Sequence, residues 1–366
     1  MIVLALISII AILLTYLEGR KCLQHGMLLG FILVVLVSAI RYDYGNDYWS
    51  YFTKFQDVSL YNSFSDIVAN YSGNEIVWVF LNYIFQPLGF YCFVAVLSVI
   101  NGIVYYKLIK QYVDKNKRWF AVFIYLFSNA FFSVQLSMLR QGLAMGLVIL
   151  GYLYLDKRRY VYASVLMLCA LVIHTSAIFS LPIVAVHFLD FKNKRLAILT
   201  ITVCSIAFFV FGDVILSTSV FLLSSNEIFD RYQDKYILGN EYETAGLKNI
   251  TGMVLLMYPV LMYLIYIRNK KSDPRIRRLC CISIIGILVS FMGQSIPMAG
   301  RMAWYYTVFS IAAVPQSFFC VKRKLIRRIV IAVFIIVTLK EYIGFYTSET
   351  WSQMHYHYHT LFELLS

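Results

Sequence analysis

The sequence predicts an all-α membrane protein that crosses the bilayer about twelve times and forms a single integral membrane domain over residues 1–366. Of its 366 residues, 60% are hydrophobic and only 14% are charged, and the mean hydropathy is +0.71. Soluble domains carry about 25% charged residues. Long apolar runs alternate with short basic clusters, and each run is close to the length that spans a bilayer as a helix.

The distribution of charge predicts the orientation. A net charge of +13 could indicate a nucleic-acid-binding protein, but the basic residues lie in short clusters between apolar runs, and we expect no nucleic acid partner. Six clusters hold 24 of the 32 Lys and Arg residues and only 5 of the 19 Asp and Glu residues. The positive-inside rule places them in the cytoplasm and both termini outside. The clusters are residues 18–25, 107–118, 156–159, 190–195, 268–278 and 322–328.

The apolar runs give the expected spans. The first run is followed, not preceded, by its charges, so it lacks the basic region of a signal peptide and is expected to remain as a span. Residues 75–86 are also apolar, but counting them would place the cluster at 107–118 outside. We expect them to be the outer end of one long helix that is kinked near Pro87 and Gly89. The expected spans are residues 1–17, 26–40, 88–106, 119–135, 139–155, 160–174, 176–189, 196–215, 250–267, 279–296, 303–321 and 329–346.

Neither a disulfide nor a metal site is expected. The seven cysteines lie in or at the ends of apolar runs and show no CxxC spacing. The tail from His355 to His359 reads HYHYH and would align three imidazoles if extended, but it has no evident acidic or cysteine partner. No inner loop has the glycine-rich pattern of a nucleotide site.

Two outer loops are long, residues 41–74 and 216–249, and the first is rich in aromatic residues. It begins RYDYGNDYWSYF, in which Gly45 and the following Asn predict a turn that bends the chain back over the membrane surface. Tyr48 and Trp49 fit either an interfacial aromatic belt or a platform for sugars. The belt does not explain Asp47, which is a candidate general base or ligand of a substrate hydroxyl.

Arg140 and His174 stand at the far ends of two apolar runs that meet at the basic turn 157–159. Both polar groups should therefore lie at a similar depth near the outer face. Polar residues at membrane depth are expensive and are commonly functional. The alternatives are that Arg140 is a snorkelling anchor and that His174 caps a helix. Gln141 and the small residues of the following turns instead favour a position inside a helix bundle.

Other outer basic residues form a candidate anion site. Arg41 and Arg301 also stand at outer ends of spans, and together with Arg140 they could hold a diphosphate, because a guanidinium stays protonated and binds phosphate oxygens bidentately. Arg231 and Tyr232 in the second long loop carry a weaker signal, for which an exposed solvated patch is the alternative.

At these residues the sequence resembles the EpsG-like group of Wzy-type polymerases, which make bacterial O-antigens and exopolysaccharides. The matching motifs lie in the expected order along most of the chain. Asn46 departs from the pattern, since such proteins often carry Thr there. The matching residues are Arg41, Gly45, Asp47 and Tyr48 in the first loop, LRQGLA at Arg140, His174 with Ser176, and Arg301 before its aromatic residues.

The resemblance implies a glycosyltransferase of the bacterial inner membrane whose active site faces the periplasm, with an architecture related to the GT-C glycosyltransferases. Such enzymes move a growing glycan from undecaprenyl diphosphate to the non-reducing end of a new carrier-linked repeat unit, in O-antigen and lipopolysaccharide biosynthesis. We expect neither a cofactor nor a metal. The expected partners are lipid-linked glycans, the bilayer and a chain-length regulator.

The residues suggest which side chains bind the diphosphate and which accept the proton in such a reaction. Arg140 and Arg301, helped by Arg41, are expected to hold the donor diphosphate. His174 is the preferred base because imidazole titrates near neutral pH, and Asp47 is the alternative base or orients the acceptor sugar.

Three other functions remain as alternatives. A flippase or transporter for lipid-linked oligosaccharides should show repeat halves and broken helices, and the sequence has no convincing internal repeat. An O-antigen ligase differs mainly in its acceptor. A membrane acyltransferase leaves the outer arginines unexplained.

Overall fold

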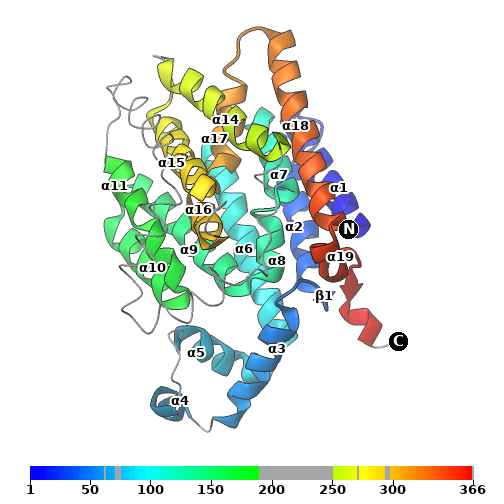
Figure 1. Cartoon of the computed structure of the whole chain (residues 1–366), viewed down its shortest axis with the longest axis vertical. Coiled ribbons are helices and arrows are strands. Elements are labelled where there is room, and N and C mark those ends of the chain that lie inside the picture. Colours follow the sequence, from blue (N-terminus) through cyan, green and yellow to red (C-terminus); the bar gives the residue numbers. More distant parts are fainter. Residues whose placement is uncertain (62, 71–75, 189–249, 270–271, 293–296, 365–366) are drawn as a thin grey trace. The chain divides into compact units, whose positions relative to one another are not determined.

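The computed structural model describes residues 1–61, 63–70, 76–188, 250–269, 272–292 and 297–364. These residues are almost entirely helical, so the expected all-α class is confirmed (Figure 1). They fall into two compact units. Unit 1 comprises Met1–Ile178 and Thr338–Ser366, and unit 2 comprises Phe179–Val337. The expected span 196–215 and the second long loop lie outside the described residues.

In unit 1, helices α1, α2, α6, α9 and α10 correspond to expected apolar runs, whereas α3 and α4 lie within the expected loop 41–74. The helix of the run 119–135 breaks at residues 128–131 into α7 and α8. Asn129 in this break donates a hydrogen bond from its Nδ2 to the carbonyl oxygen of Glu341 at 3.1 Å. The helices up to α10 are α1 (Ile2–Gly19), α2 (Gly26–Ala39), α3 (Tyr48–Asp57), α4 (Phe64–Asn70), α5 (Ile76–Phe85), α6 (Phe90–Tyr112), α7 (Arg118–Phe127), α8 (Phe132–Ser137), α9 (Leu139–Asp156) and α10 (Tyr160–Ile173).

Short elements connect these helices and extend unit 1 to the C-terminus. The expected kink near Pro87 is a complete break: α5 ends, a 3-10 turn (Gln86–Leu88) follows, and Gly89 begins α6 from a left-handed φ of 83°. The remaining elements of the unit are β1 (Arg41–Tyr42), the last part of α18 (Lys324–Thr347), α19 (Glu349–His355), β2 (His359–Thr360) and the 3-10 helices Val58–Leu60, Lys115–Lys117, Thr175–Ser180, which ends in unit 2, and Leu361–Leu364.

Unit 2 is also helical. Gly286 lets α15 (Pro274–Met292) lie close to α16 (Pro297–Thr307), since a Cβ atom at position 286 would lie 2.6 Å from the Cβ of Tyr306. Helix α14 contains Pro259 and helix α17 contains Pro315. The helices are α11 (Pro182–Phe188), α14 (Ile250–Arg268), α15 (Pro274–Met292), α16 (Pro297–Thr307), α17 (Ser310–Phe318) and the first part of α18.

The helices identify the chain as a membrane-embedded protein. Among the described residues, α1, α6 and α18 are each long and apolar enough to cross a bilayer. Helices α1, α10 and α18 also expose large apolar side chains along one face. Exposed apolar surface of this extent is unusual in a protein surrounded by water and is typical of contact with lipid. These exposed residues include Ile2, Leu6, Ile9 and Leu13 of α1, Val161, Val165, Leu168 and Val172 of α10, and Leu325, Ile329, Val333 and Ile336 of α18.

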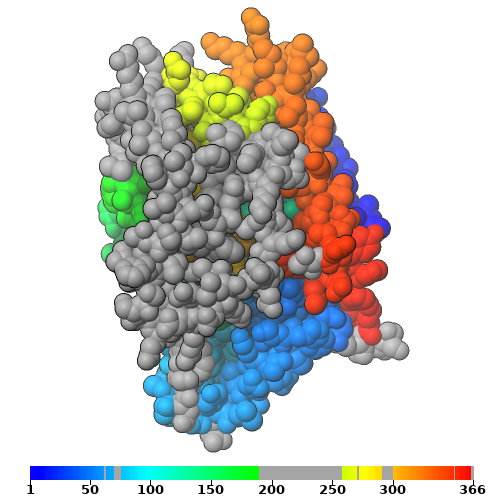
Figure 2. Space-filling model, viewed as in Figure 1, coloured from blue at the N-terminus to red at the C-terminus, as the bar shows by residue number. Residues whose placement is uncertain are grey.

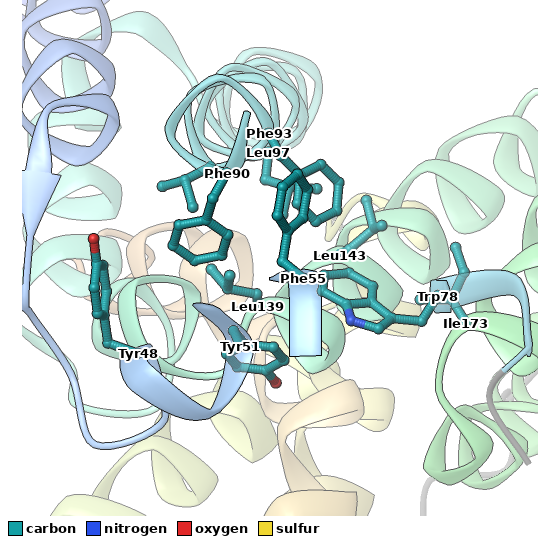
Figure 3. Close-up of a cluster of buried hydrophobic side chains, with 11 residues drawn as sticks. Tyr48, Tyr51, Phe55, Trp78, Phe90, Phe93, Leu97, Leu139, Leu143 and Ile173 are labelled. Atoms are coloured by element: carbon teal, nitrogen blue, oxygen red, sulfur yellow. The ribbon is translucent and has the colours of Figure 1, made fainter. Parts of the chain in front are cut away.

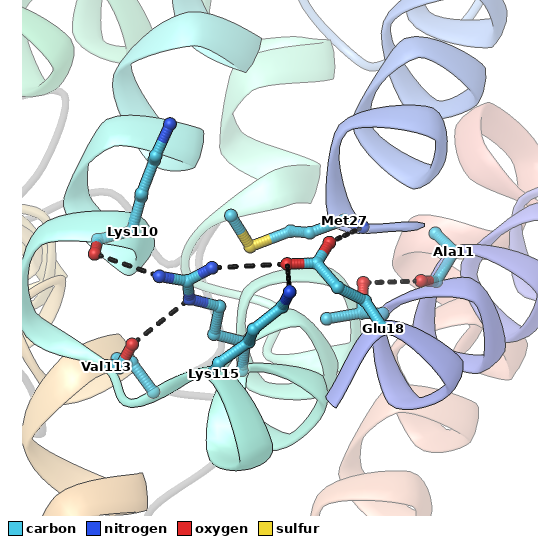
Figure 4. A network of polar contacts seen from close by, with 8 residues as sticks. Ala11, Glu18, Met27, Lys110, Val113 and Lys115 are labelled. Carbon is cyan, nitrogen blue, oxygen red and sulfur yellow. Dashed lines mark hydrogen bonds and ion pairs between the residues drawn. The ribbon is translucent and has the colours of Figure 1, made fainter. Parts of the chain in front are cut away.

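Glu18 at the end of α1 anchors a charged network (Figure 4). Its Oε1 lies 3.3 Å from Nη1 of Arg118 and 3.8 Å from Nζ of Lys115, and its Oε2 accepts the backbone N–H of Met27 at 2.8 Å. Arg118 also donates from its Nε to the carbonyl oxygen of Val113 at 3.1 Å. The network joins the start of α2 to the turn between α6 and α7.

Replacing Glu18 with Gln should lower the stability of the protein in detergent by about 1–3 kcal/mol, because the buried carboxylate makes charge-assisted hydrogen bonds. Thermal unfolding followed by intrinsic fluorescence measures this. Lys115→Ala is the control, since the Lys115 side chain is 55% exposed and such pairs contribute at most about 1 kcal/mol. A Glu18→Gln protein as stable as the wild type would contradict the role of the network.

Candidate functional site

Residues 41–48, called the first outer turn because the charge pattern predicts them outside, leave α2 through β1 and enter α3. Asp43 and Gly45 both have positive φ, 43° and 103° respectively, and Asp47 is the N-cap residue of α3. The sequence predicted this turn at Gly45. The left-handed φ of Gly45 explains the residue type, because side chains with a Cβ are strained there.

The turn presses against the junction between α8 and α9. A Cβ atom at position 45 would lie 2.9 Å from the Cα of Ser137. The Ser137 hydroxyl donates a hydrogen bond to the side-chain oxygen of Asn46, and Nδ2 of Asn46 lies 3.5 Å from Oδ1 of Asp47. Gly45 thus permits residues 45 and 46, which directly precede Asp47, to approach the end of α8 closely.

Arg140 lies in the first turn of α9 and faces α3. Its guanidinium carbon is 5.6 Å from the centre of the Tyr51 ring, which is a cation–π distance. Burial raises the pKa of Tyr51; Arg140 opposes this rise and Asp47 adds to it. Tyr51 therefore lies within electrostatic range of both charged residues. The amino end of α9 adds positive potential at the same place.

Small residues of α9 let it approach α6 closely, as the sequence analysis expected. A Cβ atom at Gly146 would lie 3.3 Å from Oδ1 of Asn101 in α6, and one at Gly142 would lie 3.2 Å from the Cα of Gln135 in α8. Gln141, which directly precedes Gly142, is buried. The LRQGLA motif thus starts a helix that is packed inside unit 1.

One buried apolar cluster joins both ends of the predicted hairpin (Figure 3). Leu139, which precedes Arg140, and Ile173, which precedes His174, both belong to it. His174 is the C-cap residue of α10 and is partly buried. The cluster comprises Tyr48, Tyr51, Phe55, Trp78, Phe90, Phe93, Val94, Leu97, Leu139, Leu143 and Ile173.

Arg41 occupies a different place from the one expected. Its side chain is 2% exposed, and Nη1 donates to the carbonyl oxygen of Ser38 and, at 3.1 Å, to the hydroxyl of Ser98. Arg41 and Ser98 line a cavity of about 10 Å³ together with Asn101 and Gln135, which is room for about one water molecule. In this structure the Arg41 side chain is thus buried and hydrogen-bonded within the helices of unit 1.

The aromatic residues of the turn form a continuous group around Trp49. Trp49 is 48% exposed, and its ring meets those of Tyr42, Tyr48 and Phe52 edge-to-face at 6.1, 5.4 and 5.6 Å. Tyr48 is buried against Phe90 at 5.6 Å. The group is therefore buried at Tyr48 and exposed at the ring of Trp49.

The remaining expected site residues are Arg301, Arg231 and Tyr232. Arg301 lies in α16 of unit 2 and is partly buried. Arg231 and Tyr232 lie outside the described residues. Among the residues that the structure covers, no group of three or more His, Cys, Asp or Glu side chains could hold a metal ion.

The C-terminal tail has the acidic partner that the sequence analysis did not find. His359 Nδ1 lies 2.6 Å from Oε2 of Glu363, four residues later. His355 is 1% exposed, and burial lowers its pKa to about 4. Its Nδ1 lies 3.2 Å from the carbonyl oxygen of Trp351. His355 is thus a neutral structural residue at pH 7.

Acid should loosen this tail before it unfolds the rest of unit 1. The pKa of His355 is near 6.5 in an unfolded chain and about 4 when folded, so folding stability is lost as the pH falls from 6.5 to 4. The amino group of Met1 opposes protonation further, and the nearby Tyr44 and Tyr346 are neutral in this range. Hydrogen exchange of residues 349–361 at pH 7 and pH 4.5 measures the effect. A His355→Gln protein should lose this pH dependence.

Sequence reasoning missed Tyr44, Tyr51 and His355 as parts of the site. Tyr51 was visible only as one aromatic residue among several. The contact of Tyr44 with His355 joins residues 311 positions apart, for which a single sequence holds no signal.

Comparison with known proteins places the chain in a family. No curated protein and no solved structure matches it. The sequence model of the EpsG family matches residues 26–359, which include the first outer turn, Arg140, His174 and Arg301. With nearly the whole length matched, the chain belongs to the EpsG family of glycosyltransferase-like polymerases.

Proposed function

We propose that the protein polymerises a polysaccharide at the periplasmic face of the bacterial inner membrane. It transfers a growing glycan from undecaprenyl diphosphate to the non-reducing end of a new repeat unit on the same kind of carrier. The observation that carries the proposal is the position of Arg140, at the amino end of α9 beside Tyr51 and near Asp47. A guanidinium at a helix N-terminus suits a diphosphate leaving group.

The reaction requires one bond to form and one to break. A hydroxyl oxygen of the acceptor sugar attacks the anomeric carbon of the donor glycan, and the bond from that carbon to the diphosphate oxygen breaks. The electron pair leaves on undecaprenyl diphosphate, where Arg140 stabilises the developing charge. Arg301 is proposed as a second diphosphate ligand. Arg41, the third expected ligand, is buried and donates hydrogen bonds to Ser38 and Ser98.

The proton of the acceptor hydroxyl passes to a base, for which we propose His174. It ends α10 next to Ile173, whose cluster also contains Leu139 and Tyr51. Asp47 then orients the acceptor sugar. Trp49 offers the exposed aromatic face on which a sugar ring can stack.

His174→Ala should slow polymer formation about 10²- to 10⁴-fold, the range for loss of a general base. The lipid-linked repeat unit should still bind with unchanged affinity. Turnover and binding measured on the purified variant check both points. His187→Ala, in α11 of unit 2, is the control histidine. Unimpaired turnover in the His174 variant would transfer the role of base to Asp47.

A flippase for lipid-linked glycans is the second candidate function. The break at residues 128–131 favours it, because transporters commonly contain discontinuous helices. An O-antigen ligase and a membrane acyltransferase have no specific observation in their favour.

Deleting the gene and displaying the surface glycan on a gel separates these functions. Loss of a polymerase should leave the lipid core with a single repeat unit. Loss of a flippase or a ligase should leave no repeat unit on the core, and loss of an acyltransferase should leave the full ladder. The single-repeat pattern is the result we expect, and either of the other two would overturn the proposal.

A further inference from the structure

The C-terminal segment, residues 349–364, folds back onto the first outer turn. β1 pairs antiparallel with β2, so that Arg41 lies opposite Thr360 and Tyr42 opposite His359. The backbone N–H of Leu361 donates to the carbonyl oxygen of Ile40 at 2.9 Å. Figure 1 shows β1 beside α19, and Figure 2 shows the red C-terminal residues in contact with the blue residues of the first loop on one face.

The C-terminal segment also contacts the turn directly, through hydrogen bonds and aromatic rings. The backbone N–H of Gly45 donates to the carbonyl oxygen of Met354 at 3.1 Å. The Tyr44 hydroxyl donates to the carbonyl oxygen of His355 at 3.0 Å, and the two rings meet edge-to-face at 5.6 Å. Tyr44 is fully buried, and its ring also lies 5.6 Å from that of Tyr358. Tyr44 and Gly45 are therefore both hydrogen-bonded to the C-terminal segment.

The turn needs such support. Asp43 is a non-glycine residue with φ of 43°, and conformations of this kind are strained and persist only where the surroundings impose them. Ser137 contacts the turn through Gly45 and Asn46, and the C-terminal segment contacts it through Gly45 and Tyr44. The conformation of residues 43–46, which lead into Asp47, is fixed between these two contacts.

We propose that the C-terminal segment is the element that positions the first outer turn, with Tyr44 and His355 as its positioning residues. Without their contact the turn leaves Ser137, and Asp47 no longer stays near Tyr51 and Arg140. The consequence for glycan transfer rests on the proposed function, whereas the positioning of the turn does not.

Disulfide formation between Asn46→Cys and Ser137→Cys measures the position of the turn directly, because the two native side chains share a hydrogen bond. The full-length protein in detergent is treated with a mild oxidant, and the linked peptide pair is quantified by mass spectrometry. Each single cysteine variant is the blank. We expect Tyr44→Ala or His355→Ala to slow this linkage roughly tenfold, since each loses the buried ring contact.

His357→Ala is the matched control, because His357 is an exposed histidine of the same segment. It should leave the linkage rate unchanged. Tyr44→Phe keeps the ring contact and loses only the hydroxyl, so it should slow the linkage less than Tyr44→Ala. If Tyr44→Ala does not fold, hydrogen exchange at the Gly45 amide in the Tyr44→Phe protein serves instead, and faster exchange than in the wild type is expected. An unchanged linkage rate in the folded variants, or unchanged exchange, would overturn the positioning role.

Turnover separates positioning from general destabilisation. At a temperature well below unfolding, Tyr44→Ala should lower kcat for glycan transfer and leave KM for the lipid-linked donor unchanged, because Arg140 is untouched. A rise in KM with unchanged kcat would overturn the link to Asp47. A wild-type protein that makes no polymer would contradict the proposed function, and the linkage experiment would still decide the positioning.

Discussion

Replacing Arg140 with Ala should abolish the polymer ladder while the protein remains at its normal level in the membrane. The guanidinium is the charged group at the amino end of α9, and it is held 5.6 Å from the Tyr51 ring. Loss of one such electrostatic donor typically costs about 10²- to 10³-fold in turnover. Arg140→Lys should recover part of this loss, because an ammonium keeps the charge but neither stacks on tyrosine nor binds a diphosphate bidentately.

Arg159→Ala is the matched control for Arg140, since Arg159 is an exposed arginine at the other end of the same helical hairpin. It should leave the ladder intact. Immunoblotting of membranes gives the protein level, and gel analysis of the surface glycan gives the chain-length distribution. A full ladder in the Arg140→Ala strain would rule out the diphosphate role.

Gly45→Ala should cause the second large loss, by displacing the first outer turn. The added Cβ would lie 2.9 Å from the Cα of Ser137, and the φ of 103° is one that alanine adopts only under strain. Strain of this kind costs about 1–3 kcal/mol, and displacement of Asp47 should lower turnover about 10²-fold, as expected for misplaced reacting groups.

Gly89→Ala separates the effect of backbone strain from the effect of the contact with Ser137. Gly89 also has a positive φ, 83°, but a Cβ atom there would meet nothing within 4 Å. Its substitution should lower the melting temperature by a similar strain term and leave turnover unchanged. Equal turnover in the Gly45 and Gly89 variants would mean that the contact with Ser137 does not matter for the reaction.

The sequence predicted best those features that local patterns determine. The runs 139–155 and 160–174 correspond to α9 (Leu139–Asp156) and α10 (Tyr160–Ile173) because charged residues bound each apolar run. The turn at Gly45 followed from the preference of glycine for positive φ. Packing of α9 through Gly142 and Gly146 followed from their small size.

Features that depend on distant contacts were not predictable. The burial of Arg41 depends on Ser98, which is 57 residues away, and an arginine at a span end reads the same whether it points outward or into the bundle. The break at residues 128–131 interrupts a run of apolar composition that would also suit one helix. The contact of Tyr44 with His355 requires the two ends of unit 1 to meet.

Reconstitution tests the account most directly. Purified protein in proteoliposomes receives undecaprenyl-diphosphate-linked repeat units as its only substrate, with no nucleotide sugar. We predict a ladder of longer lipid-linked glycans, with one undecaprenyl diphosphate molecule released for each new glycosidic linkage. Both the ladder and the release should be lost with Arg140→Ala. Movement of the intact repeat unit across the bilayer without any new linkage would contradict the account.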